Sequence, residues 1–179
     1  MRHVELGCGR NKPLGAYGID ISPDSDADLV ADLSNGIPLP DHQASLVTSH
    51  HFMEHMASWP ALLWDTWRVL EPGGTVSFCV PYAQAQSAAD PSHPGLVTEY
   101  WLRNCWEVHA YFEDIVFSFK YDERLLEVAQ RAVPGASIGD LKALFWNVCT
   151  TMTFTATARH EKLSREDAED AKTAYLEGR

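Results

Sequence analysis

The chain has 179 residues, of which 45% are hydrophobic and 22% charged, and its formal net charge at pH 7 is −11. This length suits one globular domain with a core of its own, and the acidic balance argues against nucleic acid or an anionic membrane as the main partner. We see no apolar run near the roughly 18 residues that span a bilayer and no signal-peptide pattern, so we expect a cytoplasmic protein without membrane association.

The cysteines are four isolated residues without a C-x-x-C pair: Cys8, Cys79, Cys105 and Cys149. Such spacing argues against a disulfide framework and against a structural zinc site. We therefore predict free thiols in a reducing compartment.

The first element is V-E-L-G-C-G at residues 4–9, which predicts a strand that opens into a tight turn. Glycine permits positive φ and lets a ligand approach the bare backbone. A dinucleotide-binding turn would have a third glycine where the chain has Lys12, and its acidic residue would follow about 20 residues later. Asp20 comes too early for that role, so the spacing argues against a dinucleotide fold.

Two short apolar segments follow, Y-G-I-D-I at residues 17–21 and L-V-A-D-L at residues 29–33, and each has an Asp near its end. The connections before and between them are too short for the crossover helices that usually join parallel strands. We expect loops there, and the Asp20 carboxylate is suited to accept the two hydroxyls of a ribose.

The middle of the chain alternates strand and helix patterns. Residues 44–50 predict a buried strand, and a helix with Ser58 as its N-cap follows. We expect Gly73-Gly74 to end that helix and residues 75–81 to form the next strand. The apolar positions at helical spacing are Trp59, Leu63, Trp67 and Leu70.

The second half is less regular, with a polar loop from Tyr82 to Gly95 where parallel sheets place ligand-contacting loops. The patterns beyond it predict a helix at 98–106, a strand at 109–121, a helix at 122–132, a full or partial helix at 140–147 and a strand at 150–158. We expect residues 1–160 to form a single domain and residues 161–179 a charged C-terminal helix or tail.

Four ordered motifs carry a family resemblance: residues 4–9, residues 17–33, L-V-T-S-H-H-F-M-E-H at 46–55, and W-R-V-L-E-P-G-G at 67–74. Over this first half the sequence resembles the class I S-adenosylmethionine-dependent methyltransferases. The resemblance implies an α/β, Rossmann-like, mostly parallel seven-stranded sheet, here with shortened first crossovers and an antiparallel edge pair. D-P-S-H at residues 90–93 is similar to a segment in a compact bacterial branch of that family.

The resemblance also implies S-adenosyl-L-methionine as cofactor, with Asp32 and the backbone of Leu33 at its adenine. Arg10 and Lys12 are either partners of its methionine carboxylate or solvated loop cations. The predicted cofactor-binding residues are Glu5, Gly7, Cys8, Gly9, Asp20, Ile21, Asp32, Leu33, Ser49 and His50.

The cofactor's sulfonium makes its methyl group electrophilic, so the protein mainly has to position an acceptor, and a general base helps if the acceptor is a neutral hydroxyl or amine. We rank His50 first, because it follows the fourth strand at the edge where ligands bind. His93 and Tyr82 are weaker catalytic candidates.

Two further groups have competing interpretations. His51 and His55 lie one helical turn apart with Glu54 between them, which is compatible with a metal site. The order is not H-E-x-x-H, so we favour a structural role for Glu54 and His55 and predict no metal site. A group of aromatic residues lines either an acceptor pocket or the core: Tyr100, Trp101, Trp106, Tyr111 and Phe112.

The sequence thus predicts methyl transfer to a small or medium-sized metabolite. The alternatives are a cofactor-binding protein without turnover and, less favoured, a dinucleotide-dependent oxidoreductase. The acceptor atom and the oligomeric state are not defined by the sequence.

Overall fold

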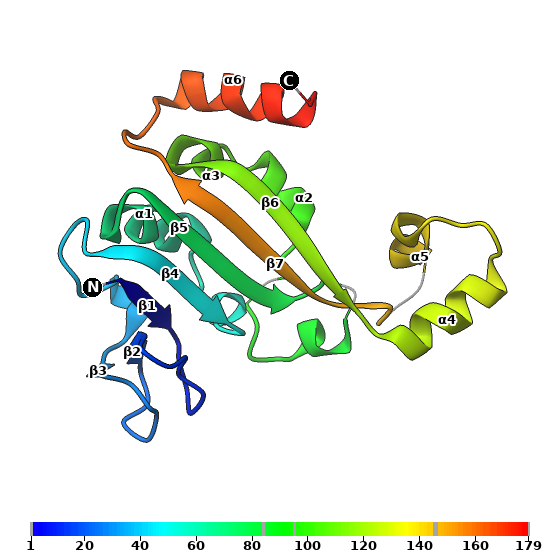
Figure 1. Cartoon of the computed structure of the whole chain (residues 1–179), viewed down its shortest axis with the longest axis horizontal. Coiled ribbons are helices and arrows are strands. Elements are labelled where there is room, and N and C mark those ends of the chain that lie inside the picture. Colours follow the sequence, from blue (N-terminus) through cyan, green and yellow to red (C-terminus); the bar gives the residue numbers. More distant parts are fainter. Residues whose placement is uncertain (1, 84, 95, 145–146, 179) are drawn as a thin grey trace.

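The computed structural model describes residues 2–83, 85–94, 96–144 and 147–178. Seven strands form one sheet in the order β3-β2-β1-β4-β5-β7-β6 (Figure 1). β1 to β5 are parallel, and β7 runs antiparallel to both β5 and β6. The predicted fold class is therefore confirmed. The strands are β1 (His3–Leu6), β2 (Tyr17–Asp20), β3 (Leu29–Val30), β4 (Ala44–His50), β5 (Leu70–Pro81), β6 (Phe112–Tyr121) and β7 (Cys149–Ala158).

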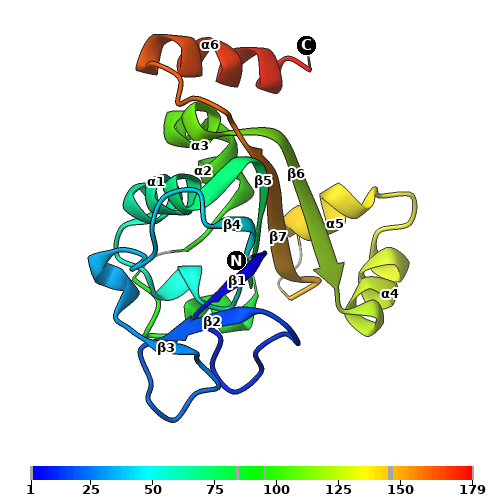
Figure 2. The ribbon, with the colours of Figure 1, turned by 60° about the vertical axis from the view of Figure 1, so that its left-hand side comes forward.

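The helices divide into two groups. In Figure 2, α1, α2 and α3 lie on one side of the sheet with α6 above α3, whereas α4 and α5 lie together beyond the end of β6. The α-helices are α1 (Trp59–Val69), α2 (Glu99–Asn104), α3 (Trp106–Tyr111), α4 (Glu123–Ala132), α5 (Ile138–Leu144) and α6 (Arg165–Leu176). Short 3-10 turns are η1 (Leu33–Asn35), η2 (Met53–His55) and η3 (Gln86–Ala89).

The first two crossovers are loops, as predicted: residues 7–16 and 21–28 contain no helix. The Asp28 carboxylate links them, because its Oδ2 accepts from the Gly18 backbone N–H at 2.8 Å and from Lys12 Nζ at 2.7 Å. These two interactions also hold the pKa of Asp28 below its ordinary value, with the Lys12 hydrogen bond as the larger cause. Side-chain contacts thus replace helix packing at this edge of the sheet.

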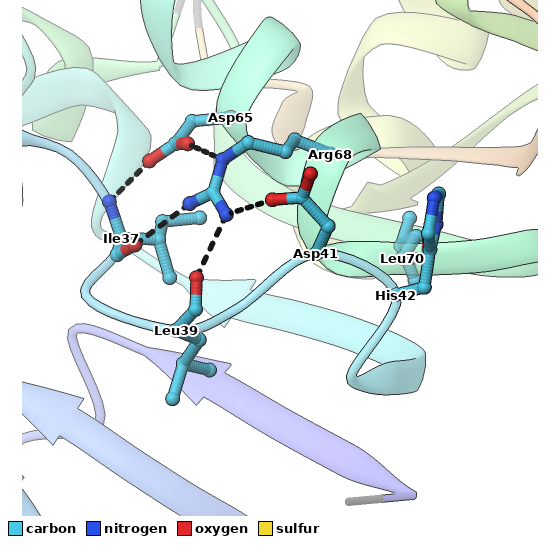
Figure 3. Close-up of polar contacts among 7 residues, drawn as sticks. All are labelled: Ile37, Leu39, Asp41, His42, Asp65, Arg68 and Leu70. Carbon is cyan, nitrogen blue, oxygen red and sulfur yellow. Dashed lines mark hydrogen bonds and ion pairs between the residues drawn. The ribbon is translucent and has the colours of Figure 1, made fainter.

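The loop between β3 and β4 is fastened to α1 by one arginine (Figure 3). Arg68 donates to the carbonyls of Ile37 (2.9 Å) and Leu39 (2.7 Å), and it pairs with Asp65 (2.6 Å) and Asp41 (2.8 Å). The buried Asp65 carboxylate accepts in turn from the Ile37 backbone N–H. The arginine of the R-V-L motif is therefore a structural clamp, which fixes the loop next to Asp32.

The predicted end of α1 was wrong. The helix stops at Val69, since Leu70 is already extended (ψ 138°) and the strand β5 runs from Leu70 through the two glycines. Pro72 cannot donate within a helix, and Gly73 has a positive φ of 78°. The glycines therefore lie in the irregular start of β5, beside the register shift between β4 and β5.

The predicted helix at 98–106 and strand from His109 were also partly wrong. The chain forms two short helices, α2 and α3, separated at Cys105, which has extended backbone (ψ 116°). His109 to Tyr111 belong to α3, and β6 begins at Phe112. Three residues are too few for period-2 alternation to distinguish a strand from a helix end.

The remaining elements agree with the patterns. β7 places its threonines on the partly exposed side and its apolar residues on the buried side. Asp122 caps α4 through its side chain, and Ser164 does the same for α6. The predicted helix at 140–147 corresponds to α5, which ends at Leu144; residues 145–146 lie outside the described residues.

The charged C-terminal segment is a helix that packs onto the rest of the chain. Ala168 of α6 is fully buried, and Arg103 donates to the Tyr175 hydroxyl at 2.8 Å. The ring of Tyr175 lies 5.3 Å from that of His109 in α3. These contacts make α6 part of the packed structure.

Two expectations concern the whole chain. All four cysteines are free thiols. Within the described ranges, none of the helices has the length and apolar character needed to cross a membrane.

Candidate active site

The turn after β1 is shaped by two glycines with positive φ, Gly7 (64°) and Gly9 (52°). A Cβ on Gly7 would lie 2.4 Å from the ring of Phe52, so this position excludes larger residues by space as well as by conformation. A Cβ on Gly9 would meet no described atom within 4 Å. The turn therefore presents open backbone at Gly9.

Asp20, at the end of β2, closes this turn from the neighbouring strand. Its Oδ2 accepts from the Gly9 backbone N–H at 2.8 Å, and its Oδ1 accepts from the Ser22 N–H at 2.8 Å. Each carboxylate oxygen keeps a second lone pair. The next residue, Ile21, exposes 65% of its surface. A rigid acceptor and an exposed apolar side chain thus lie together at this edge.

Asp32 and Leu33 follow β3. Asp32 is the N-cap of η1, with its carboxylate accepting from the Ser34 N–H (2.9 Å) and the Asn35 side chain (3.2 Å). The hydrogen bonds with Ser34 lower the pKa of Asp32. Leu33 is buried. Both residues border a cavity of about 560 Å³ that extends to Trp64 and Arg68 of α1.

The described lining of that cavity does not include the glycine turn or Asp20. The structure therefore shows two parts, an open turn formed by β1 and β2 and a hollow beside η1.

A buried glutamate lies under the exposed His50. Glu5 is only 2% exposed; it accepts from the Thr48 hydroxyl through Oε2, and its Oε1 lies 3.0 Å from His50 Nδ1. His3 Nε2 lies 2.6 Å from the Thr48 hydroxyl oxygen. Because the side chain of His50 is 62% exposed, its contact with Glu5 fixes the ring while Nε2 can face solvent.

Two other predicted residues have buried side chains. Ser49 is completely buried, and its hydroxyl has no hydrogen-bond partner within the described part of the chain. Cys8 is also buried, and burial raises the pKa of its thiol. A ligand at this edge would meet their backbone, so neither side chain is suited to chemistry.

His93 and Tyr82 lie in different surroundings from His50. The ring of His93 meets that of His55 edge-on, with centroids 4.7 Å apart. Tyr82 packs edge-on against Phe119 at 5.8 Å, with Lys142 Nζ 5.1 Å from the Tyr82 ring. Burial raises the pKa of Tyr82, which disfavours its phenolate as a base.

The loop cations are engaged with the protein itself. Lys12 pairs with Asp28, and Arg10 Nε donates to the Asp24 carbonyl at 3.2 Å. The prediction offered Lys12 as a partner of the cofactor's carboxylate or as a solvated loop cation, and in the structure its ammonium group pairs with Asp28.

The aromatic group divides between core and surface. Tyr111 and Phe112 are buried, whereas Tyr100 is 75% exposed. Trp101 meets Trp59 edge-on at 5.5 Å, and both line a second cavity of about 230 Å³. Trp101 is thus a member of the group that lines a cavity, whereas Tyr111 and Phe112 belong to the core.

From the sequence, we named Glu5 and His50 separately but did not predict that their side chains contact each other. The signal was present in the strand pattern, because Glu5 faces Thr48 in the parallel pairing of β1 and β4, and His50 follows two residues later. Side chains two residues apart in a strand lie on one face. An acidic residue in β1 and a histidine at the end of β4 are therefore expected to meet once the strands are known to pair.

Comparison with known protein families identifies a methyltransferase domain. Residues 4–78 match the family model described as a methyltransferase domain. No curated protein matches the sequence at a significant level.

Solved structures agree with the family match. A S-adenosylmethionine-dependent methyltransferase from Archaeoglobus fulgidus is similar at TM-score 0.68 and 19% identity, over 87% of this chain and 85% of that one. Phosphoethanolamine N-methyltransferase 2 of Haemonchus contortus, in complex with S-adenosyl-L-methionine, has a TM-score of 0.64 and 15% sequence identity. The match covers 89% of this chain and 49% of that one. Geranyl diphosphate C-methyltransferase from Streptomyces coelicolor A3(2), in complex with S-adenosyl-L-homocysteine, has a TM-score of 0.57 and 14% sequence identity. The match covers 87% of this chain and 73% of that one.

Proposed function

We propose that this chain, which belongs to the class I S-adenosylmethionine-dependent methyltransferases, transfers a methyl group to a small or medium-sized metabolite. One observation carries the proposal: an exposed histidine oriented by a buried glutamate lies at the end of β4, next to the strand that leads into the open glycine turn. In parallel sheets, ligands bind at this edge of the strands.

The residues of the turn suit the cofactor. The free lone pairs of Asp20 would accept the two ribose hydroxyls, and the open backbone at Gly9 leaves room beside them. The exposed Ile21 would cover one face of the adenine, and Asp32 with the Leu33 backbone would meet its polar edge. These residues follow three adjacent strands, β1, β2 and β3, which supports a ligand that extends along this edge of the sheet.

The chemistry then depends on position and proton removal. When bound, S-adenosylmethionine supplies a methyl group that is electrophilic because it sits on a sulfonium. Glu5 accepts the Nδ1 proton of His50, which directs the free lone pair of Nε2 outward. His50 thereby becomes a general base for a hydroxyl or amine acceptor, an effect of roughly 100- to 10,000-fold.

A small acceptor is supported by charge and by space. The net charge of −11 disfavours a polyanion. The 230 Å³ cavity is lined mainly by apolar side chains, among them Met56, Trp59, Leu96 and Trp101. The similar structures from H. contortus and S. coelicolor are named for small acceptors, phosphoethanolamine and geranyl diphosphate.

Calorimetry tests the cofactor assignment. The folded protein should bind S-adenosylmethionine and S-adenosylhomocysteine, and Asp20→Ala should weaken both by about 1.5 to 3 kcal/mol because two hydroxyl donors lose a charged acceptor. Unchanged affinity in the variant would reduce Asp20 to a residue that braces the turn. Binding of NAD in place of both ligands would replace the proposal with an oxidoreductase.

A radiolabelled methyl-transfer screen against small hydroxyl and amine compounds tests turnover. With an acceptor found, His50→Ala should lower kcat at least tenfold while cofactor affinity stays within a few-fold. Equal losses in both quantities would mean that His50 shapes the cofactor pocket. Cofactor binding without turnover on any acceptor would favour the non-catalytic alternative.

A further inference from the structure

We propose that Glu54, His55 and His93 form a binding site for a divalent first-row transition metal ion, which fastens the loop after β5 to the segment after β4. One donor atom from each of these side chains lies within 4.8 Å of the other two. Glu54 and His55 belong to η2, whereas His93 comes from the D-P-S-H segment. The sequence predicted no metal site at His51, Glu54 and His55, because their order is not H-E-x-x-H. His93 lies 38 residues beyond His55, outside any local motif.

The buried carboxylate supplies an independent reason. Glu54 is only 3% exposed, and its Oε1 lies 3.2 Å from His51 Nδ1. Its Oε2 is buried and has no hydrogen-bond partner among the described residues. A buried carboxylate oxygen without a partner is costly, and a bound cation would compensate it.

The contacts of His93 present one nitrogen to the cluster. Its Nδ1 lies 3.4 Å from the Ala88 carbonyl oxygen, which can only accept, so Nδ1 carries the proton. Nε2 then holds a free lone pair. A backbone carbonyl that accepts from the second ring nitrogen is the usual arrangement around a metal-binding histidine.

His55 is oriented in the same way through two other residues of the segment. The Ser92 hydroxyl donates to Asp90 Oδ1 at 2.7 Å, so its oxygen remains an acceptor for His55 Nδ1 at 3.5 Å. Nδ1 of His55 therefore carries its proton, and Nε2 is free. The chain from Asp90 through Ser92 to His55 resembles the carboxylate partners that orient metal-binding imidazoles.

The donor set defines the class of ion. Two neutral imidazoles and one carboxylate suit zinc and its first-row neighbours rather than magnesium or calcium, which prefer oxygen donors. With metal bonds of about 2.1 Å, donors lie roughly 3.4 to 4.2 Å apart, so small side-chain rotations bring the present cluster onto an ion. Three protein donors leave a fourth position open.

Such an ion would hold the loop in place. His93 lies in the segment after β5, and η2 follows β4, so the ion would join the loops at the carboxyl ends of two adjacent strands. His93 bound to a metal has no free lone pair for proton removal. The site would thus position the loop beside the proposed acceptor region and leave His50 as the base.

The test measures metal binding directly and does not depend on methyl transfer. Tag-free protein, stripped with a chelator, is titrated with zinc in competition with a fluorescent chelator, and its melting temperature is followed. Wild type should bind one zinc and melt at a higher temperature with the ion. His93→Ala and Glu54→Gln should each weaken zinc at least tenfold, and Ser92→Ala should weaken it about tenfold through the loss of orientation.

His160→Ala is the matched control, since His160 is an exposed histidine in the turn after β7. It should bind zinc like wild type. Cobalt substituted for zinc should give a spectrum without thiolate charge transfer. Cysteine ligation, equal affinity in His93→Ala and wild type, or the absence of stoichiometric binding would each overturn the proposal. His55→Ala provides a second removal of a donor if one of the other variants fails to fold.

Discussion

Two buried glutamates each contact a histidine: Glu5 in β1 and Glu54 in η2, which follows β4. They differ in how many of their carboxylate oxygens have hydrogen-bond partners. Both oxygens of Glu5 have partners, Thr48 on one side and His50 on the other. Glu54 has His51 at one oxygen and no partner from the described chain at the other. Both carboxylates contact a histidine, and the oxygen of Glu54 without a described partner is the one that the proposed metal ion would satisfy.

A third buried carboxylate shows what full compensation requires. Asp65 pairs with Arg68 and also accepts from the Ile37 N–H (Figure 3). Its partners are a charge and a backbone donor, both from the protein. Removing one of them should therefore convert Asp65 into the situation of Glu54.

The largest effect is expected from Arg68→Met. The substitution leaves Asp65 buried without its cation and frees the carbonyls of Ile37 and Leu39, so the free energy of unfolding should fall by about 3 to 5 kcal/mol. Urea denaturation measures it. Arg131→Met removes an exposed i,i+4 pair with Glu127 and should change stability by less than about 0.5 kcal/mol. Similar values for the two variants would contradict the clamp.

Glu5→Met should have the next largest effect. It removes the acceptor of the buried Thr48 hydroxyl and of His50, and the free energy of unfolding should fall by about 1 to 3 kcal/mol. The turnover rate should fall as well, because His50 loses the group that orients its ring. Loss of stability with full turnover would show that His50 does not depend on Glu5.

Glu54→Met is the counterpart of Glu5→Met, and its free energy of unfolding is measured in the presence of a chelator. Because it removes a buried charge that the protein leaves partly unpaired, stability should stay within about 1 kcal/mol of wild type or rise. Addition of zinc should then stabilise wild type and leave the variant unchanged. A loss as large as that of Glu5→Met would mean that the described structure lacks an important partner of Glu54.

The features that depend on residues close in the chain could be predicted from the sequence, whereas the contacts between residues far apart in the chain could not. The glycine turn, the Asp at the end of β2 and the alternation of β7 depend on residues close in the chain. The contact of Glu5 with Thr48 joins residues 43 positions apart, and its recognition requires the strand register. The glycines at 73–74 were misassigned because the same residues end helices and begin irregular strands.

His109 is a buried histidine that contacts no carboxylate among the residues that the structure describes, and it gives the smallest expected effect. The residue is 2% exposed, and its Nε2 donates to the Arg103 carbonyl at 2.9 Å. Burial is the largest cause that lowers the pKa of His109 below its ordinary value, and the charges of Lys172 and Arg159 act in the same direction. The hydrogen bond to the Arg103 carbonyl and the charge of Glu169 oppose them.

The sign of the pH dependence follows from that direction. As the pH falls below about 6.5, the unfolded chain takes up a proton on this histidine before the folded protein does, so stability declines until the folded pKa is reached. One proton contributes at most about 1.4 kcal/mol per pH unit. His109→Gln retains a donor for the Arg103 carbonyl and should flatten the decline between pH 6.5 and 5.5 in urea titrations, whereas His160→Gln at an exposed site should not. An unchanged slope in His109→Gln would assign the acid sensitivity to other groups.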